Sequence, residues 1–166
     1  MKNRFLILVS AISLYANTSS FDYIYPYSDP TFSNYGTVGL ISVPNARFLK
    51  EGSLAFSWNR AQPYLRGSIL AYPFSWLEAS YQYTDINNQL YSDSFAFSGN
   101  QTYKDKGFDV KIRILKETNS TPQVALGLRD IAGTGLFASE YFVASKQINN
   151  IDFTFGFGWG TLLAQG

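Results

Sequence analysis

The segment IDFTFGFGWG, residues 151–160, alternates large apolar side chains with small or polar ones. Successive side chains of a β-strand point to opposite faces of a sheet, so one face of this segment is apolar and the other is small or polar. A strand of a soluble sandwich can have this pattern. In a transmembrane β-barrel the apolar side chains face lipid and the small or polar ones face the lumen. The segment therefore predicts a strand and leaves both settings open.

The same period of two recurs along the chain, and we found no helical period. After residue 52, turn residues separate about seven segments of this kind, which are expected to form hairpins. The strands are expected at residues 54–59, 65–72, 77–84, 108–114, 124–128, 141–147 and 151–159. The predicted fold class is all-β: an antiparallel meander forming part of an outer-membrane β-barrel.

The N-terminus has the features of a secretory signal peptide. Lys2 and Arg4 form a charged start, and the apolar run that follows, residues 5–14, is too short to span a bilayer as a helix. We therefore predict a signal peptide over residues 1–16, with cleavage between 16 and 20. The alternative is a buried N-terminal helix, but this stretch lacks a cap and an amphipathic period.

The rest of the chain divides into two parts. Residues 21–50 are rich in Tyr, Pro, Asp, Ser and Gly and are predicted to be irregular, apart from a short strand before Pro44. Residues 51–166 are predicted to be the barrel portion and to be incomplete, because about seven strands fall short of the eight in the smallest bacterial barrels. Within it, the polar stretch 85–106 is predicted to be a long exposed loop.

Composition excludes several classes of function. The net charge of +1 gives no electrostatic basis for binding nucleic acid. The absence of Cys and His excludes Ser-His-Asp and Cys-His catalysis and zinc sites built on those residues. We expect no cofactor and no metal. Aromatic residues make up 17% of the chain, in keeping with the aromatic girdles of membrane barrels.

Polar residues between the outward apolar positions are the candidates for a lumen-facing surface. These candidates are Glu78, Gln82, Asp109, Lys111, Arg113 and Arg129. In a soluble sandwich the same face would be solvated. Arg129 and Asp130, with Glu140 nearby in sequence, are expected to form an inward ion pair of structural importance. A glycosidase would need two of the carboxylates about 5–10 Å apart across a cleft, which sequence cannot place.

Two long segments, TYKDKGFDVK (102–111) and GLRDIAGTGLFASEY (127–141), resemble the YjbH-type exopolysaccharide biosynthesis proteins of Gram-negative bacteria. Residues 39–47, 76–86 and 156–160 also fit. The resemblance implies an outer-membrane β-barrel that works in polysaccharide export, with no defined catalytic residue. The family-motif residues that it marks as loop candidates are Tyr103, Lys104, Asp105, Lys106, Asp130, Gly133, Gly135 and Glu140.

Members of that family are commonly several times longer, so the resemblance implies that this chain is an N-terminal fragment, with a truncated gene product as the alternative. Some members are described as lipoproteins, an anchor not expected of a chain without Cys. The resemblance implies outer-membrane lipid, exopolysaccharide and other polysaccharide-export proteins as partners. The predicted function is to assist exopolysaccharide export to the cell surface. The alternatives are a soluble periplasmic β-sandwich that binds polysaccharide or a secretion partner, and a glycan-modifying enzyme.

Overall fold

The computed structural model describes the backbone of residues 7–14 and the whole of residues 30–161. Within these ranges the chain forms ten strands and one short helix. In chain order they are β1 (Ile7–Leu14), β2 (Gly39–Leu40), β3 (Val43–Pro44), β4 (Leu54–Ala61), β5 (Tyr64–Phe74), β6 (Leu77–Leu90), α1 (Phe95–Ser98), β7 (Thr102–Leu115), β8 (Gln123–Arg129), β9 (Ser139–Ile148) and β10 (Ile151–Gly160).

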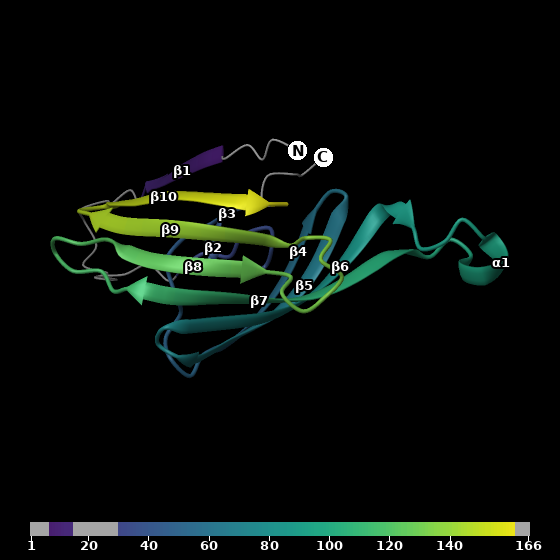
Figure 1. The fold of residues 1–166 in the computed structure, drawn as a ribbon, viewed down its shortest axis with the longest axis horizontal. Helices are drawn as coiled ribbons and strands as arrows, with labels where there is room; N and C mark the ends of the chain where they lie inside the picture. The colour runs from purple at the N-terminus through teal and green to yellow at the C-terminus, as the bar shows by residue number, and fades with distance from the viewer. Residues whose placement is uncertain (1–6, 15–29, 162–166) are drawn as a thin grey trace, which may run out of the picture.

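One antiparallel sheet contains eight of the strands, in the order β1-β10-β9-β8-β7-β6-β5-β4. From β4 to β10 every pair of neighbours in the sheet is also consecutive in the chain. The sheet curls into a half-barrel (Figure 1). Its edge strands β1 and β4 are not paired with each other in the described part of the chain, so the sheet is open there. The predicted all-β meander of seven strands after residue 52 is confirmed.

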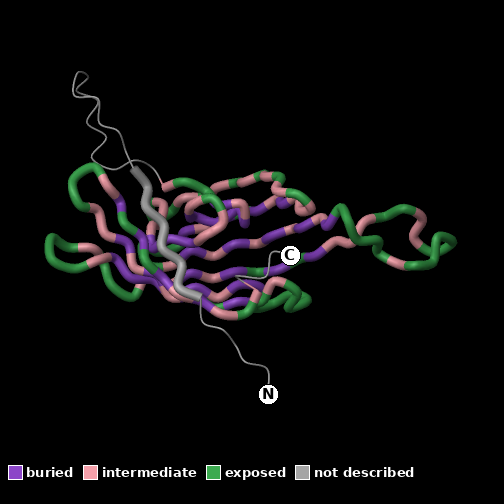
Figure 2. Tube along the Cα trace, turned by 90° about the horizontal axis from the view of Figure 1, so that it is seen from above, coloured by how far each residue is buried: buried purple, intermediate pink, exposed green. Residues whose placement is uncertain are grey.

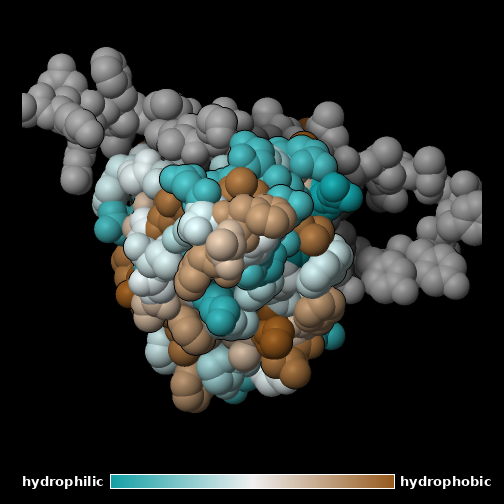
Figure 3. Space-filling model, turned by 90° about the vertical axis from the view of Figure 1, so that its right-hand side faces the viewer, coloured by the Kyte–Doolittle hydropathy of each residue, from teal (hydrophilic) through white to brown (hydrophobic). Residues whose placement is uncertain are grey.

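Alternation along each strand gives the sheet two chemically different faces. In β10, Asp152 and Thr154 are buried, whereas Phe153 and Phe155 are exposed. β6 alternates in the same way over its first ten residues. The small and polar side chains therefore lie on the concave face and the large apolar ones on the convex face. Viewed end-on, hydrophobic residues are prominent along the lower border of the described part, and hydrophilic and hydrophobic residues are mixed toward its middle and top (Figure 3).

The segment expected to be a signal peptide includes a strand in this structure. β1 pairs with β10 over its whole length, from Ile7 opposite Gly158 to Leu14 opposite Ile151. The alternative of an N-terminal helix is therefore wrong for these residues. A cleaved leader stays a prediction, and its removal would leave β10 as the edge of the sheet.

Residues 30–50, which we call the strap, run across the concave face of the sheet. The strap is irregular apart from the small β2–β3 hairpin, so the single strand expected before Pro44 is instead two strands of two residues each. Val38 packs with Leu70 and Tyr72 of β5, and Ala46 packs in a second buried cluster. Both Val38 and Ala46 are fully buried. The core therefore lies between the strap and the sheet.

The prediction of a loop over residues 85–106 is wrong at both ends. β6 continues to Leu90 and β7 begins at Thr102, so the loop is confined to residues 91–101 and contains α1. The two strands extend beyond the rest of the sheet as a hairpin (Figure 1). Asp85 lies opposite Lys104 and forms an ion pair with it at 2.9 Å. Polar cross-strand pairs thus maintain a ladder that hydrophobic periodicity does not reveal.

The two ends of the half-barrel differ in their connections. At one end, which we call the short-turn end, the strands are joined by residues 75–76, 116–122 and 149–150. At the other, which we call the long-loop end, the connections include 91–101 and 130–138. Figure 2 shows buried residues along the strands and exposed residues at the hairpin tips and around α1.

Proteolysis of the folded chain should distinguish the revised loop from the predicted one. Chymotrypsin should cut first at Tyr91, Phe95 or Phe97, because all three lie in or beside the exposed loop. Trypsin should spare Lys104 and Lys106, since both pair across the β6–β7 ladder. Mass spectrometry of early digests would identify the sites. Tryptic cleavage after these lysines as fast as chymotryptic cleavage in the loop would contradict the structure.

Candidate functional site

A buried ion pair lies at the centre of the concave face. Lys111 on β7 and Glu78 on β6 stand opposite each other in the sheet, and their Nζ and Oε2 atoms are 2.8 Å apart. Their side chains are 1% and 3% exposed. The Tyr72 hydroxyl donates to the same carboxylate at 2.6 Å. Two charges are thus removed from water, and each needs its partner to remain ionised there.

The strap is attached to this pair and to neighbouring strands by polar contacts. The Lys111 ammonium also donates to the backbone carbonyl of Arg47 at 2.9 Å and to that of Val38 at 3.4 Å. The Ser145 hydroxyl on β9 accepts from the Ala46 amide at 2.9 Å, and the Gln123 side chain donates to the Ala46 carbonyl. Three strands therefore hold the strap by its backbone.

Two buried arginines stack on aromatic rings farther along the concave face. The guanidinium groups of Arg66 and Arg129 lie 4.6 Å and 3.9 Å from the ring centre of Tyr35 in the strap. Arg129 also lies over Tyr141 at 5.4 Å. None of its side-chain nitrogens has a hydrogen-bond partner within the described residues. Cation–π contacts and the negative charge of nearby Asp109 stabilise the Arg129 guanidinium.

The expected ion pair of Arg129 with Asp130 or Glu140 is wrong, because no such pair forms within residues 30–161. Asp130 has a φ of 52° and turns away from the strand, and its carboxylate accepts the Phe137 amide at 3.1 Å. Glu140 lies next to the buried Ser139 in β9 and is exposed. The loop 130–138 engages Asp130, and Glu140 points to the opposite face of the sheet from Arg129, which lies across from Ser139.

The six lumen-facing candidates all lie along the concave side of the sheet. Glu78, Gln82, Asp109, Lys111 and Arg129 are buried, and Arg113 is partly buried at the short-turn end. Asp109 accepts from the Gln82 amide at 2.5 Å and from the Asp130 backbone amide at 2.9 Å. These residues therefore form part of one packed polar interior. Whether they line a lumen stays a prediction.

The two family-motif segments meet at the long-loop end. The Thr134 hydroxyl donates to Asp105 at 2.6 Å, which holds the loop 130–138 against β7. A Cβ at Gly133 would lie 2.4 Å from the Lys106 carbonyl oxygen, so only glycine fits there. Gly135 has a φ of 76°. Among the other motif residues, Lys104 pairs with Asp85, Tyr103 packs on Tyr91, and Lys106 is exposed.

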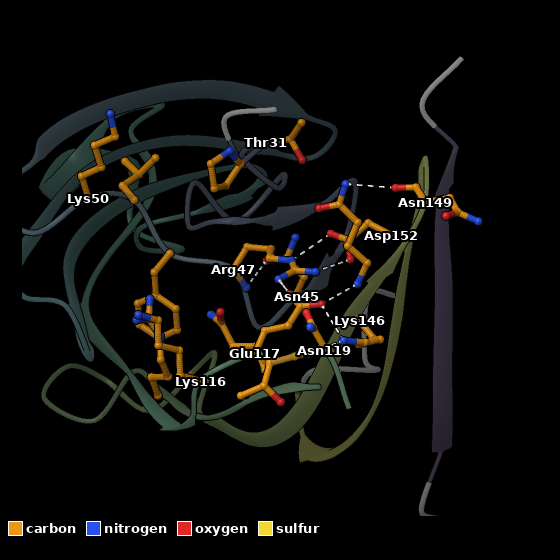
Figure 4. A pocket seen from close by; sticks show the side chains of 17 residues that line it. Thr31, Asn45, Arg47, Lys50, Lys116, Glu117, Asn119, Lys146, Asn149 and Asp152 are labelled. Atoms are coloured by element: carbon orange, nitrogen blue, oxygen red, sulfur yellow. Dashed lines mark hydrogen bonds and ion pairs between the residues drawn. The ribbon is translucent and has the colours of Figure 1, made fainter. Parts of the chain in front are cut away.

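A pocket of about 650 Å³ opens at the short-turn end, and we call it the rim pocket. It lies between the strap and the ends of β7 to β10, and its walls contain five basic side chains and two carboxylates (Figure 4). The basic side chains are Arg47, Lys50, Arg113, Lys116 and Lys146, and the carboxylates are Glu117 and Asp152.

Arg47 of the strap joins two elements across the rim pocket. Its guanidinium forms ion pairs with Asp152 on β10 and with Glu117 in the connection 116–122. Burial lowers the pKa of Arg47, but hydrogen bonds to the two carboxylates raise it by more. Burial likewise raises the pKa of Glu117, but the hydrogen bonds that it accepts from Arg47 and the Gln147 amide hold it below its usual value.

Sequence reasoning did not select Arg47, Arg66, Glu117 or Asp152. Arg66 could have been found, because it alternates with Leu65 and Gly67 in the same way as the chosen inward residues. Arg47 lies within a segment quoted for the family resemblance, but its partners lie far away in sequence. The sequence pattern of residues 30–50 does not show that the strap lies on the concave face of the sheet.

Two kinds of site are not found among the described residues 30–161, a metal cluster and a phosphate loop. Within residues 30–161 no group of three or more acidic, Cys or His side chains is arranged to hold a metal ion. The Gly133-Thr134-Gly135 segment lies in a loop that leads into β9, so no helix N-terminus follows it as a phosphate loop requires. No helix in the described parts of the chain is long and apolar enough to cross a membrane.

Comparison with known proteins identifies close relatives of the sequence. The family model described as "Exopolysaccharide biosynthesis protein YbjH", abbreviated YjbH, matches residues 31–166. A protein of Escherichia coli strain K12, named "Uncharacterized lipoprotein YjbH", is 45% identical over 167 residues. That match covers all of this chain and 24% of the relative, so the chain spans about a quarter of its length. No solved structure matches the chain.

Removing one partner of the buried ion pair should be strongly destabilising. Lys111→Met leaves Glu78 as an uncompensated buried charge and should lower the free energy of unfolding by about 3–5 kcal/mol. Adding Glu78→Gln should recover part of that loss, because the buried charge is removed. Urea titration of the parent, the two single variants and the double variant under the same conditions would measure this. Losses that simply add would show that the two groups do not interact.

Stability should depend on the ionisation of Glu117. A carboxylate whose pKa is lower in the folded chain stabilises it above its unfolded pKa, and this stabilisation is lost as pH falls through the folded value. Glu117→Gln should therefore cost about 1 kcal/mol at neutral pH and progressively less in acid. Urea titrations of both proteins between pH 7 and pH 3 would show the convergence. A difference independent of pH would contradict it.

Proposed function

The chain belongs to the YjbH family of exopolysaccharide biosynthesis proteins, and we propose that it forms part of an outer-membrane β-barrel that assists export of an exopolysaccharide. Its relative in Escherichia coli is named a lipoprotein, which supports an exported, membrane-associated protein. The proposed partners are outer-membrane lipid, the exopolysaccharide and other polysaccharide-export proteins. The periplasm is the alternative location.

The inverted polarity of the sheet carries this proposal. On the convex face Phe56, Trp58 and Phe155 are 68%, 63% and 50% exposed. On the concave face Arg66 and Lys111 are 2% and 1% exposed. A sheet in water buries its apolar face and solvates its polar one, whereas a barrel in lipid does the reverse.

The connections between strands also support the proposal. Outer-membrane barrels have short turns on the periplasmic side and longer loops on the outside. By that rule the short-turn end, with connections 75–76 and 149–150, would face the periplasm. The extended β6–β7 hairpin and loop 130–138 would then face outward.

The mode of assistance that we propose is passive. The strap fills the concave face and is held there by Lys111, Ser145 and Gln123. In this arrangement the half-barrel forms a filled section of barrel wall. The polysaccharide would pass beside this section or contact its ends, and the chain's own residues would brace the wall.

The two alternatives have less support. A sandwich needs two packed sheets, whereas the described chain has one large curled sheet and a two-stranded hairpin. For an enzyme, Glu78 and Asp109 would be the natural acids, but Lys111, Tyr72, Gln82 and a backbone amide already engage them. We propose no catalytic role.

Membrane partition tests the proposal directly. The full chain, expressed in a Gram-negative cell, should remain in the outer-membrane fraction after washing with alkaline carbonate. A soluble binder, or a peripheral protein, would be released by that wash. Release of the chain together with periplasmic marker proteins would overturn the barrel proposal and favour the soluble alternative.

A charged residue on the convex face should oppose insertion into lipid. Phe155→Arg should destabilise the chain folded in vesicles by about 2–4 kcal/mol if the side chain lies near the bilayer midplane. Denaturant titration of tryptophan fluorescence in vesicles would measure the loss.

Phe95→Arg is the matched control, because Phe95 is 72% exposed in α1 beyond the end of the sheet. It should change stability little. If Phe155→Arg cost no more than Phe95→Arg, the convex face would not lie in the hydrocarbon region.

A further inference from the structure

We propose that the rim pocket binds a carboxylate-bearing saccharide unit. This inference rests on the proposed function, because it assigns a place where this chain would contact the exported polymer. The pocket opens at the short-turn end, where the strap and the connections 116–122 and 149–150 come together (Figure 4).

The rim pocket has positive charge that the fold does not neutralise. Its two carboxylates are engaged by Arg47 and Lys146. Within residues 30–161 the other three basic side chains, Lys50, Arg113 and Lys116, form no ion pair. The surplus of cations gives the pocket a positive potential, which favours an anionic ligand.

Arg113 is the best-placed group to recognise a carboxylate. Its guanidinium lies 4.6 Å from the ring centre of Phe48, so the strap restricts its orientation. Its Nε is buried and has no hydrogen-bond partner among the described residues. A planar guanidinium fixed in this way can bind a carboxylate through two parallel hydrogen bonds. Lys116 follows β7 directly and adds a mobile charge.

The neutral groups of the pocket favour a sugar over a simple anion. Thr31, Asn119 and Asn149 also line the rim pocket and carry hydroxyl and amide groups. These groups suit the hydroxyls of a saccharide, which need both donors and acceptors. The volume of about 650 Å³ lies within the range of small-molecule sites and leaves room around a single carboxylate.

Calorimetric titration of the whole chain in detergent micelles tests the assignment. The ligands are an oligogalacturonate, a neutral galactose oligomer of equal length, and inorganic phosphate as competitor. The oligogalacturonate should bind, and added salt should weaken it. The neutral oligomer should bind at least about tenfold more weakly, since it cannot form charge-assisted hydrogen bonds.

Variants locate the binding. Arg113→Gln combined with Lys116→Gln should weaken oligogalacturonate binding by about tenfold or more. Arg60→Gln is the control, because it removes one exposed arginine from the far end of β4. It should leave binding unchanged. If the double variant does not regain the circular dichroism of the parent, the single Lys116→Gln, at an exposed position, carries the test.

Several results would overturn the inference. They are absence of oligogalacturonate binding, equal binding of the neutral oligomer, full binding by the variants, and displacement by equimolar phosphate. The last would assign the pocket to phosphate. Carbonate partition separates this inference from the proposed function. A chain that stays in the membrane but binds no oligogalacturonate refutes the saccharide site alone, whereas release from the membrane refutes the barrel whatever the pocket binds.

Discussion

Burial of the Lys111 ammonium group constrains the whole concave face. An ammonium ion taken out of water is costly unless a counter-ion and hydrogen-bond acceptors surround it. Glu78 supplies the charge from the opposite position on β6, and Tyr72 holds that carboxylate in place. The Arg47 carbonyl of the strap accepts a further hydrogen bond. The sheet and the strap are therefore coupled, since neither satisfies Lys111 without the other.

The polar concave face also explains the composition of the strap. Apolar side chains without a ring could fill the space, but they would remove the aromatic face that Tyr35 offers to both Arg66 and Arg129. Tyr35 gives both guanidinium groups an aromatic face, and backbone carbonyls accept from Lys111. Irregular backbone is useful here because its carbonyls are not all used in a ladder. The irregular backbone of the strap thus leaves carbonyls available to the partner surface.

The sequence predicted those features that depend on local period. Alternation around Phe155 and along β6 gave the strands, their order as hairpins and the inward direction of Glu78 and Lys111. It failed where partners are distant or polar. Asp85 and Lys104 extend a ladder without hydrophobic alternation, and the Arg47 partners lie far along the chain. Arg129 was paired with Asp130 by adjacency, although β8 ends at Arg129 and the carboxylate of Asp130, whose φ is positive, is engaged by the loop 130–138.

The convex face, the concave face and the rim differ in how their charged side chains are neutralised. On the convex side of β7, Phe108, Val110, Ile112 and Ile114 present no charge over the central part of the strand. On the concave side Lys111 is neutralised by a partner on the adjacent strand. At the rim Lys50 and Lys116 are exposed, so water can solvate their charges without an ion-pair partner. An anionic ligand would therefore gain most at the rim, where binding requires no buried ion pair to be broken.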